Sequence, residues 1–202
     1  MLTMRKGFSI SFADKLSEGY KTDGKFFTAN VSAQKTLPLL ESFIKLHENE
    51  RLFFILELPT PDTAEPKDEN GNIDAFHKDI YYLDDCTSAM IRDVLDIVGK
   101  ILLDDGISQF GVGSHITNDE MMICKYNIVN LYRNDEQSPL YDGFFENAGI
   151  RRADNLVTAS DMLSPSTPGE CTMCEQDGRT VYDIPPVFAE LGMYMAERCE
   201  ES

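Results

Sequence analysis

The most regular hydrophobic pattern in the chain lies between residues 86 and 104. Apolar residues recur there every three or four positions, the spacing that gathers side chains on one face of a helix. Six residues form this stripe: Ile91, Val94, Leu95, Val98, Ile101 and Leu102. Asp84 and Asp85 stand at the start as capping residues, and Gly106 stands at the end as a terminator. The pattern therefore predicts a long helix with its stripe toward the core.

Three further helices are predicted with less regular patterns. One begins with Thr36 as its cap, carries Pro38 in its first turn and ends near Asn49. Its inner face comprises Leu37, Leu40, Phe43, Ile44 and His47. A short helix is predicted at residues 153–163, and a terminal helix opens at Asp183. The terminal helix is expected to pack Val187, Phe188, Leu191, Tyr194 and Met195 inward.

Strands are predicted where apolar runs lack a helical period. Residues 52–58 are rich in aromatic and branched side chains, which indicates a buried strand in the middle of a sheet. Residues 7–31 favour two strands around a turn at 18–24, and residues 110–132 favour a hairpin with a tight bend at Asn127. The polar stretches 59–75 and 164–180 are predicted as loops. This order of elements predicts a single α+β domain over 1–202, a mainly antiparallel sheet with helices packed on one face.

The net negative charge of the chain limits which kinds of partner it can bind. The 202-residue chain carries 35 acidic against 18 basic residues, a formal net charge of −17. The excess lies after residue 50, because residues 1–50 hold seven bases and six acids. Such a surface repels phosphate backbones and anionic lipids, which argues against binding of nucleic acids or membranes. It attracts basic proteins, although surplus acidity also serves solubility alone.

The apolar runs and the cysteines indicate a cytoplasmic protein. The clearest unbroken apolar run, residues 52–56, is far shorter than the roughly 20 residues of a membrane span. The first residues lack the apolar region of a signal peptide. The five cysteines are an odd number, and two of them fall in segments predicted as core, which is typical of reduced thiols.

Two groups of residues have the types that chemistry uses. His115 followed by Asp119 and Glu120 is the best cluster for general acid-base work, although residues 118–120 also suit a turn. Cys171 and Cys174 form a CxxC that resembles half of a zinc site, and the other ligands would have to be distant single residues. Plain thiols remain the favoured interpretation. Gly111 and Gly113 are interpreted as strand glycines that permit a close neighbour, because no lysine or helix follows them.

These features favour a binding protein over an enzyme. Clustered carboxylates suit an inhibitor or immunity-type protein that occupies the cationic cleft of a toxic nuclease. Acidic immunity proteins of bacterial toxin systems are similar in size and charge, an analogy of composition that no motif accompanies. The predicted contacts are acids expected to be exposed and two aromatic anchors: Asp104, Asp105, Asp119, Glu120, Asp135, Glu136, Tyr132 and Tyr141.

Two alternatives stay open at this point. One is a small metal-dependent or acid-base hydrolase that uses His115 with Asp119 or Glu120, or a zinc ion at Cys171 and Cys174. The other is a structural or regulatory subunit in which the charge is incidental. The sequence does not define the oligomeric state.

Overall fold

A computed structural model describes residues 2–200. Its main sheet has eight strands, every neighbouring pair antiparallel, in the order β10-β5-β4-β6-β7-β8-β3-β2. The strands are β2 (Gly19–Thr22), β3 (Phe26–Asn30), β4 (Leu52–Pro59), β5 (His77–Cys86), β6 (Gln109–Ser114), β7 (Glu120–Ile123), β8 (Ile128–Tyr132) and β10 (Tyr194–Glu200). A second sheet pairs β1 (Phe8–Ile10) with β9 (Gly169–Cys171).

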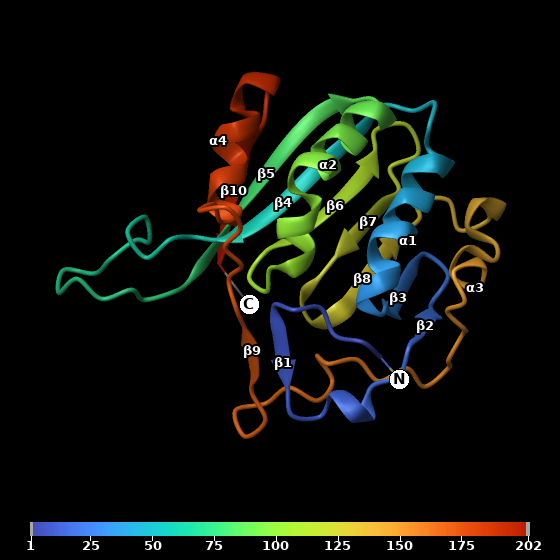
Figure 1. Ribbon diagram of the computed structural model, residues 1–202, viewed down its shortest axis with the longest axis horizontal. Coiled ribbons are helices and arrows are strands. Elements are labelled where there is room, and N and C mark those ends of the chain that lie inside the picture. The colour runs from blue at the N-terminus through green and yellow to red at the C-terminus, as the bar shows by residue number, and fades with distance from the viewer. Residues whose placement is uncertain (1, 201–202) are drawn as a thin grey trace.

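The helices lie on one side of the main sheet (Figure 1). They are α1 (Ala33–Leu46), α2 (Ser88–Asp104), α3 (Phe144–Asn147) and α4 (Ile184–Phe188). Their buried side chains share one core with the inward-facing residues of the strands. The predicted α+β class, with a mainly antiparallel sheet and helices on one face, is therefore confirmed. Across residues 2–200 no helix combines the length and apolar character that crossing a lipid bilayer requires.

The α2 helix follows its predicted stripe. All six residues of the stripe are buried. Its N-cap is Thr87, whose hydroxyl accepts the backbone N–H of Met90, so the prediction that Asp84 and Asp85 cap this helix is wrong. At the other end the buried guanidinium of Arg5 donates to the carbonyls of Leu102, Leu103 and Asp105. These bonds satisfy carbonyls that a helix end leaves without partners.

The other helix predictions need correction. The α1 helix begins one turn before Thr36, after Ser32, so that Pro38 lies inside it. Residues 153–163 form turns instead of a helix. The terminal helix ends with a 3-10 turn at Leu191, and residues 194–200 form the edge strand β10. Of the five side chains that were predicted to pack inward, Phe188 is buried and four are exposed: Val187, Leu191, Tyr194 and Met195.

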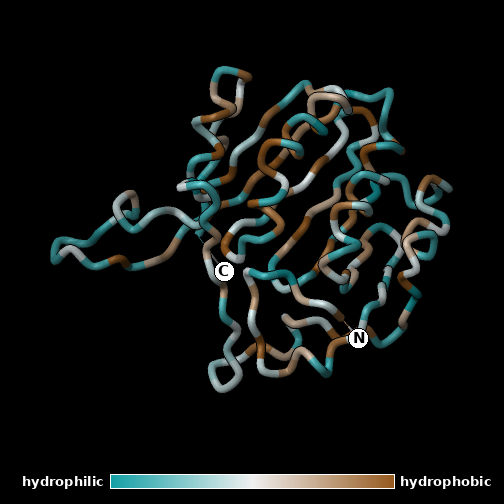
Figure 2. Tube along the Cα trace, in the orientation of Figure 1, coloured by the Kyte–Doolittle hydropathy of each residue, from teal (hydrophilic) through white to brown (hydrophobic). Residues whose placement is uncertain are grey.

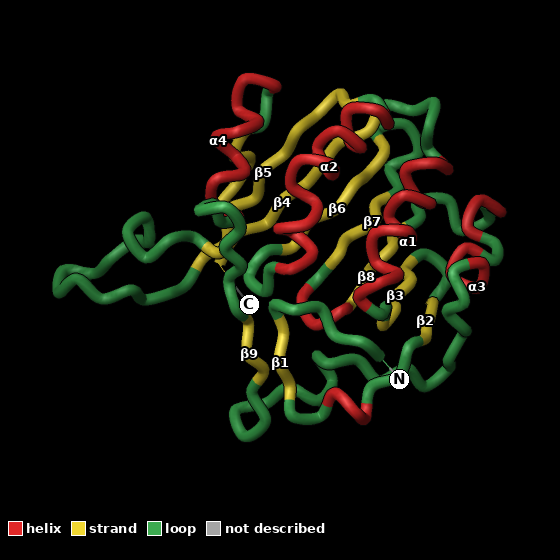
Figure 3. Tube along the Cα trace, viewed as in Figure 1, coloured by secondary structure: helices red, strands yellow, loops and turns green. Residues whose placement is uncertain are grey.

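The strand predictions hold for the centre of the sheet and fail nearer its edges. The β4 strand is internal, and β6, β7 and β8 form an antiparallel meander whose last turn has Tyr126 and Asn127 at positive φ. The predicted turn at 18–24 contains the strand β2, and β5 was not predicted. The loop at 60–76 projects from the sheet without regular structure, and it is mostly hydrophilic (Figures 2 and 3).

Candidate functional site

The face of the main sheet opposite the helices is the candidate site. Because side chains alternate along a strand, Phe54, Leu56 and Leu58 of β4 point into the core, while Phe53, Ile55 and Glu57 lie on this outer face. Register extends the outer face across the neighbouring strands to Tyr82 of β5, Glu120 of β7 and Tyr132 of β8. The sheet therefore presents a broad surface that none of the helices in residues 2–200 covers.

Two glycines of β6 shape the outer face. A Cβ atom at Gly113 would lie 2.1 Å from the ring of Phe53, and one at Gly111 would lie 2.4 Å from the sulfur of Met122. Both approaches are far closer than two carbon or sulfur atoms tolerate. The glycines thus let neighbouring side chains lie flat across β6, as their pattern in the sequence predicted.

Aromatic rings form a ridge at one end of this face. The ring centroid of Phe53 lies 5.6 Å from that of Tyr82 and 4.9 Å from that of His115. Tyr194 of β10 stands opposite Tyr82, and its hydroxyl donates to Oδ2 of Asp84 at 2.7 Å. Nε2 of His115 lies 3.0 Å from the other oxygen of Asp84. Asp84 therefore bonds both Tyr194 and His115, whereas Asp119 bonds Tyr141 and the backbone of Asn134, so the predicted pairing of His115 with Asp119 does not form.

Carboxylates surround this ridge. Burial raises the pKa of Tyr82, and four negative charges add to the shift: Glu120, Glu197, Glu57 and Asp84. The pKa of Glu120 is itself raised, first by burial and then by the charge of Glu57. Anionic groups held this close to one another favour an arriving cation that relieves their repulsion. We call the set Phe53, Glu57, Tyr82, Asp84, Glu120, Tyr194 and Glu197 the acidic aromatic surface.

A groove continues from this surface toward β2. One hollow of about 500 Å³ lies over the middle of the sheet, between Glu57, Met122 and Tyr132, and a second of about 600 Å³ lies beside it. The second hollow has lysines at its rim, Lys21, Lys78 and Lys125, of which Lys78 bonds Glu57 at 2.8 Å. The outer face is therefore polarised, with carboxylates at the aromatic end and lysines at the other.

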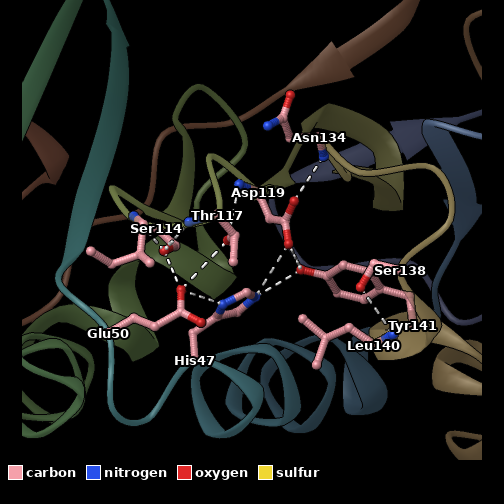
Figure 4. A network of polar contacts seen from close by, with 10 residues as sticks. His47, Glu50, Ser114, Thr117, Asp119, Asn134, Ser138, Leu140 and Tyr141 are labelled. Carbon is pink, nitrogen blue, oxygen red and sulfur yellow. Dashed lines mark hydrogen bonds and ion pairs between the residues drawn. The ribbon is translucent and has the colours of Figure 1, made fainter.

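A buried polar network supports the turn between β6 and β7 (Figure 4). His47 is fully buried at its centre. Its Nδ1 lies 2.9 Å from Oε2 of Glu50, and its Nε2 lies 2.7 Å from the hydroxyl of Tyr141. That hydroxyl donates to Oδ2 of Asp119 at 3.0 Å. Since other side chains engage both ring nitrogens, His47 is placed to hold structure together rather than to meet a substrate.

The same network holds the turn that leads into Glu120, a member of the acidic aromatic surface. The hydroxyl of Ser114 donates to Glu50 and accepts the backbone N–H groups of Ile116 and Thr117. Asp119 receives the backbone N–H of Asn134 at 2.8 Å. His115 lies within this turn and Glu120 follows it directly, so the network holds their backbone in place.

The predicted contact residues are distributed over several places. Asp105, Asp119 and Tyr141 are buried, so the expectation that they are exposed is wrong. Asp105 accepts bonds from the backbone N–H groups of Ser108 and Cys174, and burial and Asp119 together raise the pKa of Tyr141. Asp104, the last residue of α2, pairs with Lys6 and Lys100.

The remaining predicted contacts stay near the surface. Glu120 and Tyr132 lie opposite each other on the outer face. Asp135 and Glu136 are exposed in the segment that follows β8. Only Glu120 of the eight predicted residues belongs to the acidic aromatic surface. Sequence reasoning missed the other six, all of which lie on β5, β10 or the outer side of β4.

The two cysteines of the CxxC lie at and just after β9. The thiol of Cys171 lies 3.2 Å from the hydroxyl of Tyr126, and the backbone N–H of Cys174 donates to Asp105 at 2.9 Å. Within the described residues 2–200 no three His, Cys, Asp or Glu side chains are grouped so as to hold a metal ion. The zinc hypothesis therefore gains no further ligand from the fold.

Comparison with known protein families, with curated proteins and with solved structures finds no match.

Proposed function

We propose that this chain is an acidic binding protein that neutralises a basic protein partner, in the manner of an inhibitor or immunity protein. The observation that supports the proposal is the acidic aromatic surface, where four carboxylates surround an aromatic ridge on the face of the sheet opposite the described helices. Aromatic side chains are the usual anchors of protein interfaces, and carboxylates select a cationic partner.

The nature of the partner follows from charge. A net charge of −17 repels the phosphates of nucleic acids and favours a partner whose own surface is rich in lysine and arginine. A nuclease toxin has such a surface, because it must hold a nucleic acid backbone. On this proposal the carboxylates take the place of the phosphates, the enzyme is blocked by occupation of its cleft, and both proteins meet in the cytoplasm.

The test compares matched baits in a pull-down from the native host. One bait carries Asp84→Asn, Glu120→Gln and Glu197→Gln, which remove three charges from the acidic aromatic surface. The control bait carries Asp62→Asn, Glu69→Gln and Asp74→Asn, which remove three charges from the exposed loop at 60–76. We expect a basic protein to be retained by the wild-type chain and by the control and lost from the surface variant.

The retained protein is then purified and titrated against each chain. The surface variant should bind at least about tenfold more weakly, the control should stay within about twofold of the wild type, and the association rate should fall as salt is added. An acidic partner, equal binding by the two variants, or binding indifferent to salt would each refute the proposal.

A further inference from the structure

One edge strand of the main sheet is covered by another segment of the chain, and the other edge strand is open. At one edge, β2 is covered by the segment 151–153, since Tyr20 donates its N–H to the carbonyl of Arg151 and accepts the N–H of Ala153. At the other edge, β10 pairs with β5 alone among the described strands. Six of the seven residues of β10 are exposed. Edges of this kind carry backbone donors and acceptors that can pair with a further strand, and proteins usually protect them.

Exposed apolar side chains lie on α4, on the turn after it and on β10 itself (Figure 1). Val187 and Leu191 are 46% and 60% exposed on and just after α4, and Met195 of β10 is 49% exposed. Ile97 of α2 is 60% exposed and lies beside Val187 around a hollow of about 310 Å³. The apolar pattern of the terminal segment predicted burial of the first three. Their exposure next to an open edge provides apolar contacts for an added strand.

The negative charge along this edge favours a positively charged segment as the added strand. Glu190, Glu197 and Glu200 are exposed along it. The single base of β10, Arg198, is bound by both oxygens of Asp79, at 2.6 and 3.0 Å, so its charge is neutralised locally. A second copy of this chain would bring the same carboxylates to the edge and carries a net charge of −17 of its own, so the two copies repel each other. A cationic strand is the complementary occupant.

We propose that β10 is a docking edge, at which an extended cationic segment of the partner adds as a further antiparallel strand. Its backbone pairs with β10, and its apolar side chains contact Met195, Leu191 and Val187. Its lysines or arginines lie on the opposite face of the added strand, toward Glu197. The inference rests on the proposed function, because it takes the partner to be a basic protein. Beyond the proposed function, the inference specifies that the partner binds by adding a strand to β10.

The probe is a short amidated peptide in which lysine alternates with valine. Its control is the same peptide with alternate backbone nitrogens methylated, which removes hydrogen-bond donors and keeps charge and side chains. We expect the first peptide to bind and the second to bind at least about tenfold more weakly, because strand addition depends on backbone hydrogen bonds. Amide hydrogen exchange at Tyr194–Glu200 should slow only with the first peptide.

Two variants locate the binding. Val187→Lys places a positive charge near β10. The control, Val157→Lys, places the same charge at a position of equal exposure, 46%, in the segment that follows 151–153. Both positions are exposed, so both variants should fold. Only Val187→Lys should weaken the unmethylated peptide, by about tenfold. Equal binding of the two peptides, equal effects of the two variants, or no binding of either peptide would overturn the docking edge.

The outcomes separate this inference from the proposed function. If the basic partner depends on Asp84, Glu120 and Glu197 while the peptides bind equally or fail to bind, the partner docks on the outer face and β10 is not its strand site. If sedimentation of the free chain shows a dimer that Val187→Lys dissociates, a second copy occupies the edge and the inference is wrong.

Discussion

The hydroxyl of Tyr141 links two buried side chains of the polar network. It donates to Asp119 and lies within hydrogen-bond distance of His47. Removal of this hydroxyl would leave each of these two buried partners without one hydrogen bond, and water could not replace it.

We predict that Tyr141→Phe lowers the free energy of unfolding by about 2 kcal/mol. The control is Tyr132→Phe, where the hydroxyl is exposed and makes only a long contact of 3.4 Å with Asn134. That change should stay within about 0.5 kcal/mol of the wild type. Urea unfolding measures both, with the midpoint shifted and the slope unchanged. Equal stability of the two variants would show that the Tyr141 hydroxyl carries no net stabilisation.

The sequence contains only part of this site. His47 and Glu50 are three residues apart at the end of α1, a spacing that does allow contact, so a paired histidine was detectable there. Tyr141 lies 94 residues further along the chain, and nothing local connects it to His47. The sequence analysis predicted that Asp119 is the carboxylate partner of a histidine, but it chose His115. In the structure His115 faces outward and contacts Asp84, and the buried histidine near Asp119 is His47.

At the scale of elements, β10 is fixed to the sheet by one ion pair as well as by its ladder. Asp79 is buried on β5 and binds Arg198 of β10 through two hydrogen bonds. Arg198 also donates to the carbonyl of Ala64 at the base of the projecting loop. Burial acts to raise the pKa of Asp79, but the hydrogen bonds from Arg198 and Thr60 outweigh it, and the pKa is lowered.

A lowered pKa fixes the direction of a pH effect. The carboxylate stabilises the fold above the pKa of an unfolded aspartate, about 3.9, and loses this effect as the pH falls through the lower pKa of the folded state. We predict that Asp79→Asn costs about 2 kcal/mol near pH 7 and progressively less below about pH 4. Asp62→Asn, at an exposed loop position, should cost little at either pH. A cost that is independent of pH would contradict the pairing.

The elements show where sequence patterns are sufficient. The α2 helix and β4 are packed against the core, so their apolar spacing reports their structure directly. The β5 strand was missed because it mixes charged and apolar residues along its length. The start of the β10 strand was predicted as helix because Leu191, Tyr194 and Met195 recur at the spacing of one helix face, which favours a helix. Pairing with β5 overrides that preference, and this long-range contact leaves no trace in the local sequence.

At the scale of the whole molecule, charge is the dominant property. The excess of 17 negative charges is carried by a fold that pairs several of them locally, as with Asp79 and Asp104. The unpaired remainder repels itself, which opposes the compact state. Salt screens this repulsion over a distance that falls from about 30 Å at 0.01 M to about 10 Å at 0.1 M.

We predict that the midpoint of thermal unfolding rises when sodium chloride is increased from about 0.01 M to about 0.1 M at neutral pH. Scanning calorimetry measures the change, and sucrose at matched osmolarity serves as an uncharged control. A midpoint that falls with salt would show instead that attraction between paired charges outweighs the repulsion.

The unequal finish of the two sheet edges limits what the molecule can build. Endless fibrils need two free edges per molecule, so that each unit receives one neighbour and offers a site to the next. Here the segment 151–153 blocks one side, and stacking through the sheet stops after a single addition. Assemblies formed this way are restricted to closed pairs, which gives a highly charged chain an accessible pairing strand without the risk of runaway polymerisation.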